Sequence, residues 1–337
     1  MMISLLLCAL AGAPTTRPNP SMIGESLVLA GTEPGKLIGT KLDPASVIVR
    51  SAYRAGGTVY ERNKDYVLDP RAGTIARTPA SRIPDFSTNV LHGKQDFDHS
   101  KFPGYGNLPF TVYVDYAAAD LPALFQQPAD PARRLSKTRA KLEAGGPFKV
   151  IAFGDSITFG GDASAEDLRF TNRYAAHLQE RFPKAKVTLE NGATGGDNTV
   201  NGLARLQEKV LARRADLVLV GFGMNDHNRG GVAPAPFQAN LETIIKTIRE
   251  KTGADVILFS SFPPNPQWAF GTGRMNDYAA ATKGAAEAMG VPYADVYTPW
   301  MKLLERKDPP SLLGNNINHP NDFGHWLYFE ALRAIGL

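Results

Sequence analysis

The chain has 337 residues, of which 43% are hydrophobic and 21% are charged, the proportions of a folded protein with a substantial core. Its formal net charge is +4, and its basic residues are scattered apart from one cluster between Arg133 and Lys141. Because nucleic-acid binding requires a basic face or stripe with interleaved aromatic residues, this composition argues against a nucleic-acid partner.

The first 13 residues, MMISLLLCALAGA, form a short apolar stretch ending in small residues. This pattern is typical of a secretory signal, although it lacks a positive start, and it is too short to span a membrane. We therefore expect an exported protein, periplasmic or extracellular, with no stable membrane insertion after signal removal; without a functional signal it would be cytoplasmic. The only cysteine, Cys8, lies in this segment, so no disulfide, thiolate ligand or thiol nucleophile is expected in the mature chain.

After the signal and tail at 1–20, residues 21–117 have the pattern of a small β-sandwich-like module. Short runs rich in β-branched and aromatic residues are separated by Gly, Pro, Asp and Asn, which favour turns. These runs cover residues 46–53, 57–69, 73–78 and 110–116, and an irregular insertion is expected at 83–108.

Residues 118–146 change to alanine and proline and then to a charged stretch, which indicates a linker. We expect one short helix in it, with Asp130 near its cap and Pro131 at its first position.

In residues 147–337, apolar runs alternate with helical stretches, which predicts a doubly wound parallel sheet with helices on both faces. The expected strands lie at 149–153, 186–190, 216–222, 255–262 and 291–297, and the expected helices near 167–182, 199–214, 235–251, 273–289 and 320–335. Such sheets place their sites at the carboxyl ends of the strands.

Polar and glycine-rich segments follow the first three of these strands. Ser156 follows the first, in Gly-Asp-Ser, where a hydroxyl and its own N–H can face a substrate. Gly196 lies in the glycine-rich segment after the second, where backbone N–H groups can approach a ligand closely. Asn225 follows the third and offers an amide donor. Taken singly, each segment is also ordinary turn chemistry, and no nucleotide-binding pattern is met.

Of the six histidines, His319 is the one that lies in a polar loop just before the last predicted helix. His227, which follows Asn225-Asp226 at a strand end, is its best rival. His325 lies within the helix and is expected to have a surface or capping role.

These four segments, in this order, resemble the four blocks of the SGNH hydrolase superfamily, the GDSL-type esterases and lipases. They are GDSIT with Ser156, NGATGGDN with Gly196, GMND with Asn225, and NINHP with His319. The resemblance covers about 148–335 and implies a flavodoxin-like three-layer fold. It implies Ser156 as nucleophile, His319 as base, and the N–H groups of Ser156 and Gly196 with the Asn225 amide as oxyanion hole.

One position departs from the family pattern. The aspartate usually found three residues before the histidine is Asn316 here. Asparagine can orient an imidazole but supplies no charge, so Asn316 is expected to assist a Ser–His dyad. Asp155, Asp226 and Asp322 are candidate supporting carboxylates.

The expected activity is hydrolysis of esters through an acyl-enzyme, without metal or organic cofactor. The β-rich module and the signal favour an exported carbohydrate O-acetyl esterase, acting on an acylated small molecule or polysaccharide. Lipase, lysophospholipase, thioesterase and O-acyltransferase activities stay open, as does a weakened, carbohydrate-binding protein; the oligomeric state is not predicted. Because all four blocks follow the linker, we expect the module to be dispensable for chemistry.

Overall fold

The structure, a computed structural model, describes residues 21–125 and 132–337. The C-terminal part contains a five-stranded parallel sheet in the order β11-β10-β12-β13-β14. In chain order this is 2-1-3-4-5, so the flavodoxin-like doubly wound sheet predicted from the sequence is confirmed. The strands are β10 (Gly146–Gly154), β11 (Ala185–Asn191), β12 (Leu217–Gly221), β13 (Asp255–Phe259) and β14 (Tyr293–Ala294).

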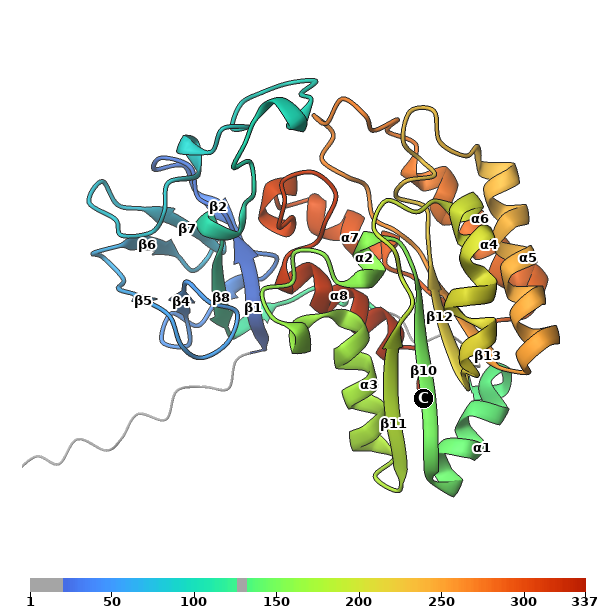
Figure 1. The fold of residues 1–337 in the computed structure, drawn as a ribbon. Coiled ribbons are helices and arrows are strands. Elements are labelled where there is room, and N and C mark those ends of the chain that lie inside the picture. Colours follow the sequence, from blue (N-terminus) through green and yellow to red (C-terminus); the bar gives the residue numbers. More distant parts are fainter. Residues whose placement is uncertain (1–20, 126–131) are drawn as a thin grey trace, which may run out of the picture.

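Helices cover both faces of this sheet. They are α2 (Ser156–Phe159), α3 (Phe170–Arg181), α4 (Thr199–Lys209), α5 (Pro234–Thr252), α6 (Met275–Met289), α7 (Tyr297–Leu304) and α8 (Asp322–Arg333). On one face α3 packs against α8, and on the other α5 packs against both α4 and α6 (Figure 1). The sequence did not predict α7, which begins at Tyr297, the last residue of the last expected strand; that strand is present as β14.

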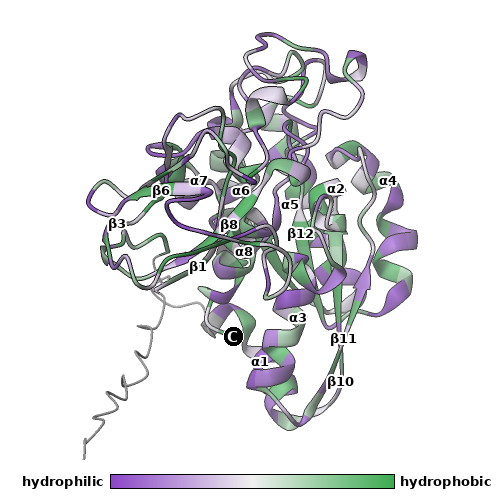
Figure 2. Ribbon diagram, turned by 90° about the vertical axis from the view of Figure 1, so that its left-hand side faces the viewer, coloured by the Kyte–Doolittle hydropathy of each residue, from purple (hydrophilic) through white to green (hydrophobic). Residues whose placement is uncertain are grey.

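The apolar runs of the central strands form the middle of the core. All five residues of β12 are buried, because helices exclude water from both faces of a parallel sheet. Figure 2 shows β12 as predominantly hydrophobic, in contrast to the hydrophilic helix α1 (Ser136–Ala144) below it.

The N-terminal residues form short antiparallel strands, which confirms the expected β-rich part. The strands are β1 (Met22–Leu27), β2 (Gly35–Lys36), β3 (Thr40–Leu42), β4 (Ile48–Arg50), β5 (Val59–Tyr60), β6 (Tyr66–Asp69), β7 (Thr74–Arg77), β8 (Val112–Tyr116) and β9 (Ala118–Asp120). They pair as β1-β8-β4-β5, β2-β7-β6 and β3-β9. Between 83 and 108 the regular structure is limited to short 3₁₀ turns and an isolated bridge from Phe97 to Trp268, as expected for an irregular insertion.

The segment expected to be a linker is packed on the sheet from Leu135 onward. Leu135 and Leu142 are fully buried, and the Thr138 hydroxyl donates to Asp255 at 2.8 Å. Asp130 and Pro131, the expected start of its helix, lie outside the described residues. The division into 1–20, 21–117, 118–146 and 147–337 stays a prediction.

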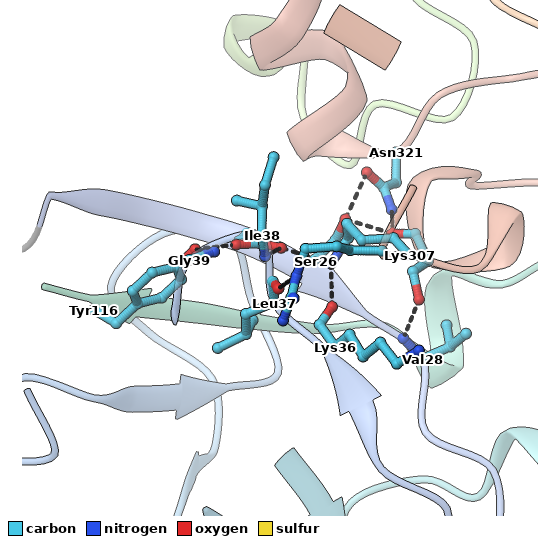
Figure 3. Close-up of polar contacts among 12 residues, drawn as sticks. Ser26, Val28, Lys36, Leu37, Ile38, Gly39, Tyr116, Lys307 and Asn321 are labelled. Carbon is cyan, nitrogen blue, oxygen red and sulfur yellow. Dashed lines mark hydrogen bonds and ion pairs between the residues drawn. The ribbon is translucent and has the colours of Figure 1, made fainter. Parts of the chain in front are cut away.

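A buried ion pair joins the N-terminal strands to the chain after α7. The Lys307 ammonium lies 2.7 Å from a Glu25 carboxylate oxygen on β1, and both side chains are fully buried. Burial lowers the pKa of Lys307, and the Glu25 carboxylate opposes that effect. Lys307 also donates to the Lys36 carbonyl, next to the contact between Ser26 and Asn321 (Figure 3). Removing either partner would leave the other charge buried and unpaired, which costs about 3–5 kcal/mol, so each residue requires the other across this contact.

Candidate active site

The proposed nucleophile lies at the carboxyl end of the first central strand. β10 ends at Gly154, and Ser156 is the first residue of α2. Asp155 caps this short helix, because its carboxylate accepts the Ile157 N–H at 2.9 Å. Gly154 is required here, since a Cβ at this position would lie 2.0 Å from the Gly221 carbonyl oxygen. The turn therefore fixes Ser156 at the sheet edge.

His319 reaches this serine from the loop before α8. Its Nε2 lies 2.8 Å from the Ser156 hydroxyl oxygen, as expected for a nucleophile and its general base. The loop is ordered by Asn315, whose side-chain oxygen accepts the N–H groups of Ile317, Asn318 and His319. The sequence predicted the pair of Ser156 and His319, and the structure brings the two together.

The group that contacts the second ring nitrogen of His319, Nδ1, is Asp162, which was not predicted. Its carboxylate oxygen lies 2.7 Å from His319 Nδ1, and the two side chains are 28% and 22% exposed. Asp162 follows Gly160-Gly161 in the loop after α2, and its φ of 61° places it in the left-handed region. A Cβ at Gly161 would lie 2.9 Å from His319 Nδ1, so the glycine leaves room for this approach.

The structure corrects the expectation for Asn316, which does not hold His319. Its side-chain oxygen instead accepts the Asn265 amide at 3.2 Å, and the Asn316 carbonyl accepts the same amide at 2.9 Å. With a φ of 60°, the Asn316 backbone is left-handed and the residue is buried against the 265 loop. The acid position of the family pattern is therefore structural in this chain.

Besides the Ser156 N–H after β10, the expected oxyanion donors lie in the loops after β11 and β12. A Cβ at Gly195 would lie 3.9 Å from the Ser156 Cβ, so this glycine-rich loop runs beside the serine. Gly196 has a φ of 80°, which glycine adopts at no cost. The Asn225 amide is fixed by donation to the Asp197 carbonyl at 2.9 Å. Their role in holding an oxyanion stays a prediction.

The three candidate supporting carboxylates are buried. Burial raises the pKa of Asp155 to about 7, next to the nucleophile. Asp226 accepts the N–H groups of Thr199 and Gly223, and so ties the start of α4, directly after the second block, to the third block. Asp322 bonds to Ser164, two residues beyond Asp162. None of the three hydrogen-bonds His319 in the described structure.

The rival histidine His227 and the helical His325 both serve the scaffold, and His325 is buried rather than at the surface. His227 is fully buried, with Nδ1 3.0 Å from the Met224 carbonyl and Nε2 accepting the Thr272 N–H. His325 Nε2 lies 3.1 Å from the Gly161 carbonyl, and burial lowers its pKa to about 4. A neutral His325 therefore holds the loop that carries Asp162.

Across residues 21–125 and 132–337 no three His, Cys, Asp or Glu side chains gather as a metal site. In the same part of the chain, no helix has the length and apolar character needed to cross a bilayer.

The arrangement is that of a Ser-His-Asp triad at the carboxyl edge of a doubly wound sheet. Residues 152–327 match the model of the GDSL-like lipase/acylhydrolase family, and the chain belongs to this family.

Named relatives cover different shares of the chain. An arylesterase from Vibrio mimicus is 34% identical over 121 residues, 35% of this chain and 56% of the relative, so the chain spans little more than half of that protein. An acetylxylan esterase from Geobacillus stearothermophilus is 25% identical over 214 residues, 58% of this chain and 97% of the relative. A solved two-domain esterase active on acetylated mannans shares the fold, with a TM-score of 0.51 and 22% identity over 60% of this chain and 53% of that one.

Proposed function

We propose that the protein is a carboxylic ester hydrolase in which Ser156 is acylated and then deacylated by water. The observation that carries this proposal is the hydrogen-bonded series from Ser156 through His319 to Asp162, with distances of 2.8 and 2.7 Å. The esterase names of the relatives and the acylhydrolase family support the same activity.

The roles follow from the geometry. His319 Nε2 takes the proton of the Ser156 hydroxyl as its oxygen attacks the ester carbonyl. Asp162 accepts the Nδ1–H, which fixes the tautomer with a free Nε2 and stabilises the imidazolium that forms. His319 then gives its proton to the departing alkoxide, and in the second half it deprotonates the water that attacks the acyl-enzyme.

The oxyanion of each tetrahedral intermediate needs hydrogen-bond donors that face the former carbonyl oxygen. We assign this role to the N–H groups of Ser156 and Gly196 and to the Asn225 amide. The hydrogen bond from Asn225 to the Asp197 carbonyl uses one of its two amide hydrogens and leaves the other for the substrate.

The proposed substrate is an O-acetyl ester on a carbohydrate. The acetylxylan esterase, matched over nearly its whole length, and the esterase active on acetylated mannans support this choice. The Asp162 carboxylate that is hydrogen-bonded to His319 supports an active hydrolase over a weakened carbohydrate-binding protein. We keep export as part of the proposal, supported by the apolar segment at 1–13.

The test compares acetate release from acetylated xylan and acetylated mannan with turnover of nitrophenyl acetate and of a long-chain nitrophenyl ester. We expect turnover of nitrophenyl acetate, little turnover of the long-chain ester, and acetate release from at least one polysaccharide. The matched control is Ser156→Ala, which keeps the fold and loses the nucleophile. Equal turnover of the long-chain ester without any acetate release would favour a lipase-like activity instead.

A further inference from the structure

A buried carboxylate at the start of α8 links the N-terminal strands to the loop that carries Asp162. Asp322 is fully buried and accepts hydrogen bonds from two sides. Its Oδ1 accepts the Ser164 N–H at 2.8 Å, and its Oδ2 accepts the Ser164 hydroxyl at 2.6 Å. From the other side, the Tyr113 hydroxyl on β8 donates to Oδ2 at 3.0 Å.

This loop needs such an anchor. Asp162, two residues before Ser164, has a φ of 61°, in the left-handed region, which is less favourable for an L-residue than the right-handed one although aspartate tolerates it better than most. Its carboxylate must nevertheless stay 2.7 Å from His319 Nδ1. Burial raises the pKa of Tyr113 well above its ordinary value, so the phenol remains a donor throughout the working pH range.

A second contact from the N-terminal part supports the histidine. The Asn107 N–H donates to the Gly314 carbonyl at 2.7 Å, and the Gly314 N–H donates to the His319 carbonyl at 2.9 Å. Gly314 also packs on the acid, since a Cβ there would lie 2.5 Å from the Asp162 Cβ. Residues before the expected linker therefore contact the His319 loop directly, through Asn107, and the Asp162 loop through Asp322.

We propose that Tyr113 is a positioning residue for the triad, acting on Asp162 through Asp322 and Ser164, so that the N-terminal strands form part of the catalytic unit. This inference rests on the proposed function, and in particular on Asp162 as the triad acid. It opposes the sequence-based expectation that the N-terminal module is dispensable for chemistry.

The test is Tyr113→Phe in the full chain, with Tyr116→Phe as its matched control. Both residues lie on β8 and are buried, and each donates from its hydroxyl to a buried carboxylate. Tyr116 bonds Glu25, which pairs with Lys307 and is not hydrogen-bonded to Ser164 or Asp162 in the described structure. For nitrophenyl acetate, Tyr113→Phe should lower kcat roughly 10-fold, of the order produced by losing one hydrogen bond to a charged acceptor, with KM within about twofold. The acidic limb of its kcat/KM profile should move to lower pH, because a displaced Asp162 stabilises the imidazolium less.

Tyr116→Phe should lower the melting temperature comparably and leave kcat and the pH profile unchanged. In an Asp162→Asn background, Tyr113→Phe should cause no further loss of kcat, because both changes act on the same contact. Ser164→Ala removes the hydroxyl that bonds Asp322 and should reproduce the shift of the acidic limb. It replaces Tyr113→Phe in the test if that variant does not fold.

Wild-type kcat and pH profile in Tyr113→Phe, or the same kcat loss in Tyr116→Phe, would overturn the inference. Failure of the proposed function is seen separately, because the wild type would then show no turnover of nitrophenyl acetate that Ser156→Ala lacks. Failure of Asp162 as the acid is seen as wild-type kcat in Asp162→Asn. An impaired Asp162→Asn beside an unaffected Tyr113→Phe would leave the triad intact and reject the positioning role alone.

Discussion

Replacing Asp162 by asparagine removes one charge from the proposed triad and keeps the shape of the side chain. In the structure the Asp162 carboxylate lies 2.7 Å from His319 Nδ1, with both side chains mostly buried. Two unit charges about 4 Å apart at an effective dielectric constant of about 20 interact by roughly 4 kcal/mol. Lost stabilisation of the imidazolium by that amount should lower kcat about 10³-fold.

The assay is the pH dependence of kcat and kcat/KM on nitrophenyl acetate for the wild type, Asp162→Asn and Asn316→Asp. Asp162→Asn should lose activity by the factor above and shift its acidic limb to lower pH. Asn316→Asp should leave that limb in place, because residue 316 faces Asn265 and not His319. A kcat above about a tenth of the wild-type value in Asp162→Asn would refute the assignment, since the acid contribution would then be below about 1.4 kcal/mol.

Three further predictions concern groups around the triad. His319→Ala should abolish turnover, whereas His227→Ala should lower the melting temperature and leave kcat nearly unchanged; a dead His227→Ala enzyme with its fold intact would contradict the assignment of the base. Asn225→Ala should lower kcat roughly 10²- to 10³-fold with little change in KM, and an effect on KM alone would argue against an oxyanion role. Burial raises the pKa of Asp155 to about 7, so between about pH 4 and pH 7 the native protein holds a proton that the unfolded chain releases. The unfolding free energy of the protein should therefore fall by up to about 4 kcal/mol as pH rises through this range. Asp155→Asn, which can still cap α2, should flatten that slope in urea unfolding at both ends of the range, and an unchanged slope would reject it.

The sequence predicted the central sheet and the hydrogen-bonded pair that we propose to react, because both depend on local patterns. Apolar strands such as β12 are buried on both faces, and Ser156 and His319 lie in short, ordered blocks. The third member escaped prediction because its position depends on tertiary geometry. Aspartate after two glycines is ordinary turn chemistry, and Asp162 meets His319 across 157 positions of the chain.

β1 escaped prediction for a related reason. Its Glu25 is a charged residue in the middle of a buried strand, and a search for buried strands by their apolar residues would pass over this segment. The residue is accommodated because Lys307, 282 positions away, pairs with it. The N-terminal part was predicted to be dispensable for a similar reason. Its contacts toward the triad run through Asn107 and Tyr113, and the residues next to these two in the sequence do not indicate that role.

The most direct test of the account is to find the acyl group on the nucleophile. The protein is mixed briefly with nitrophenyl acetate and quenched in acid, and its peptides are mapped by mass spectrometry, with Ser156→Ala as the control. The account predicts one acetyl group on the peptide that carries Ser156 and none in the control. Turnover with no acetyl group on that peptide, or an acetyl group at another residue that accumulates at the rate of turnover, would contradict it.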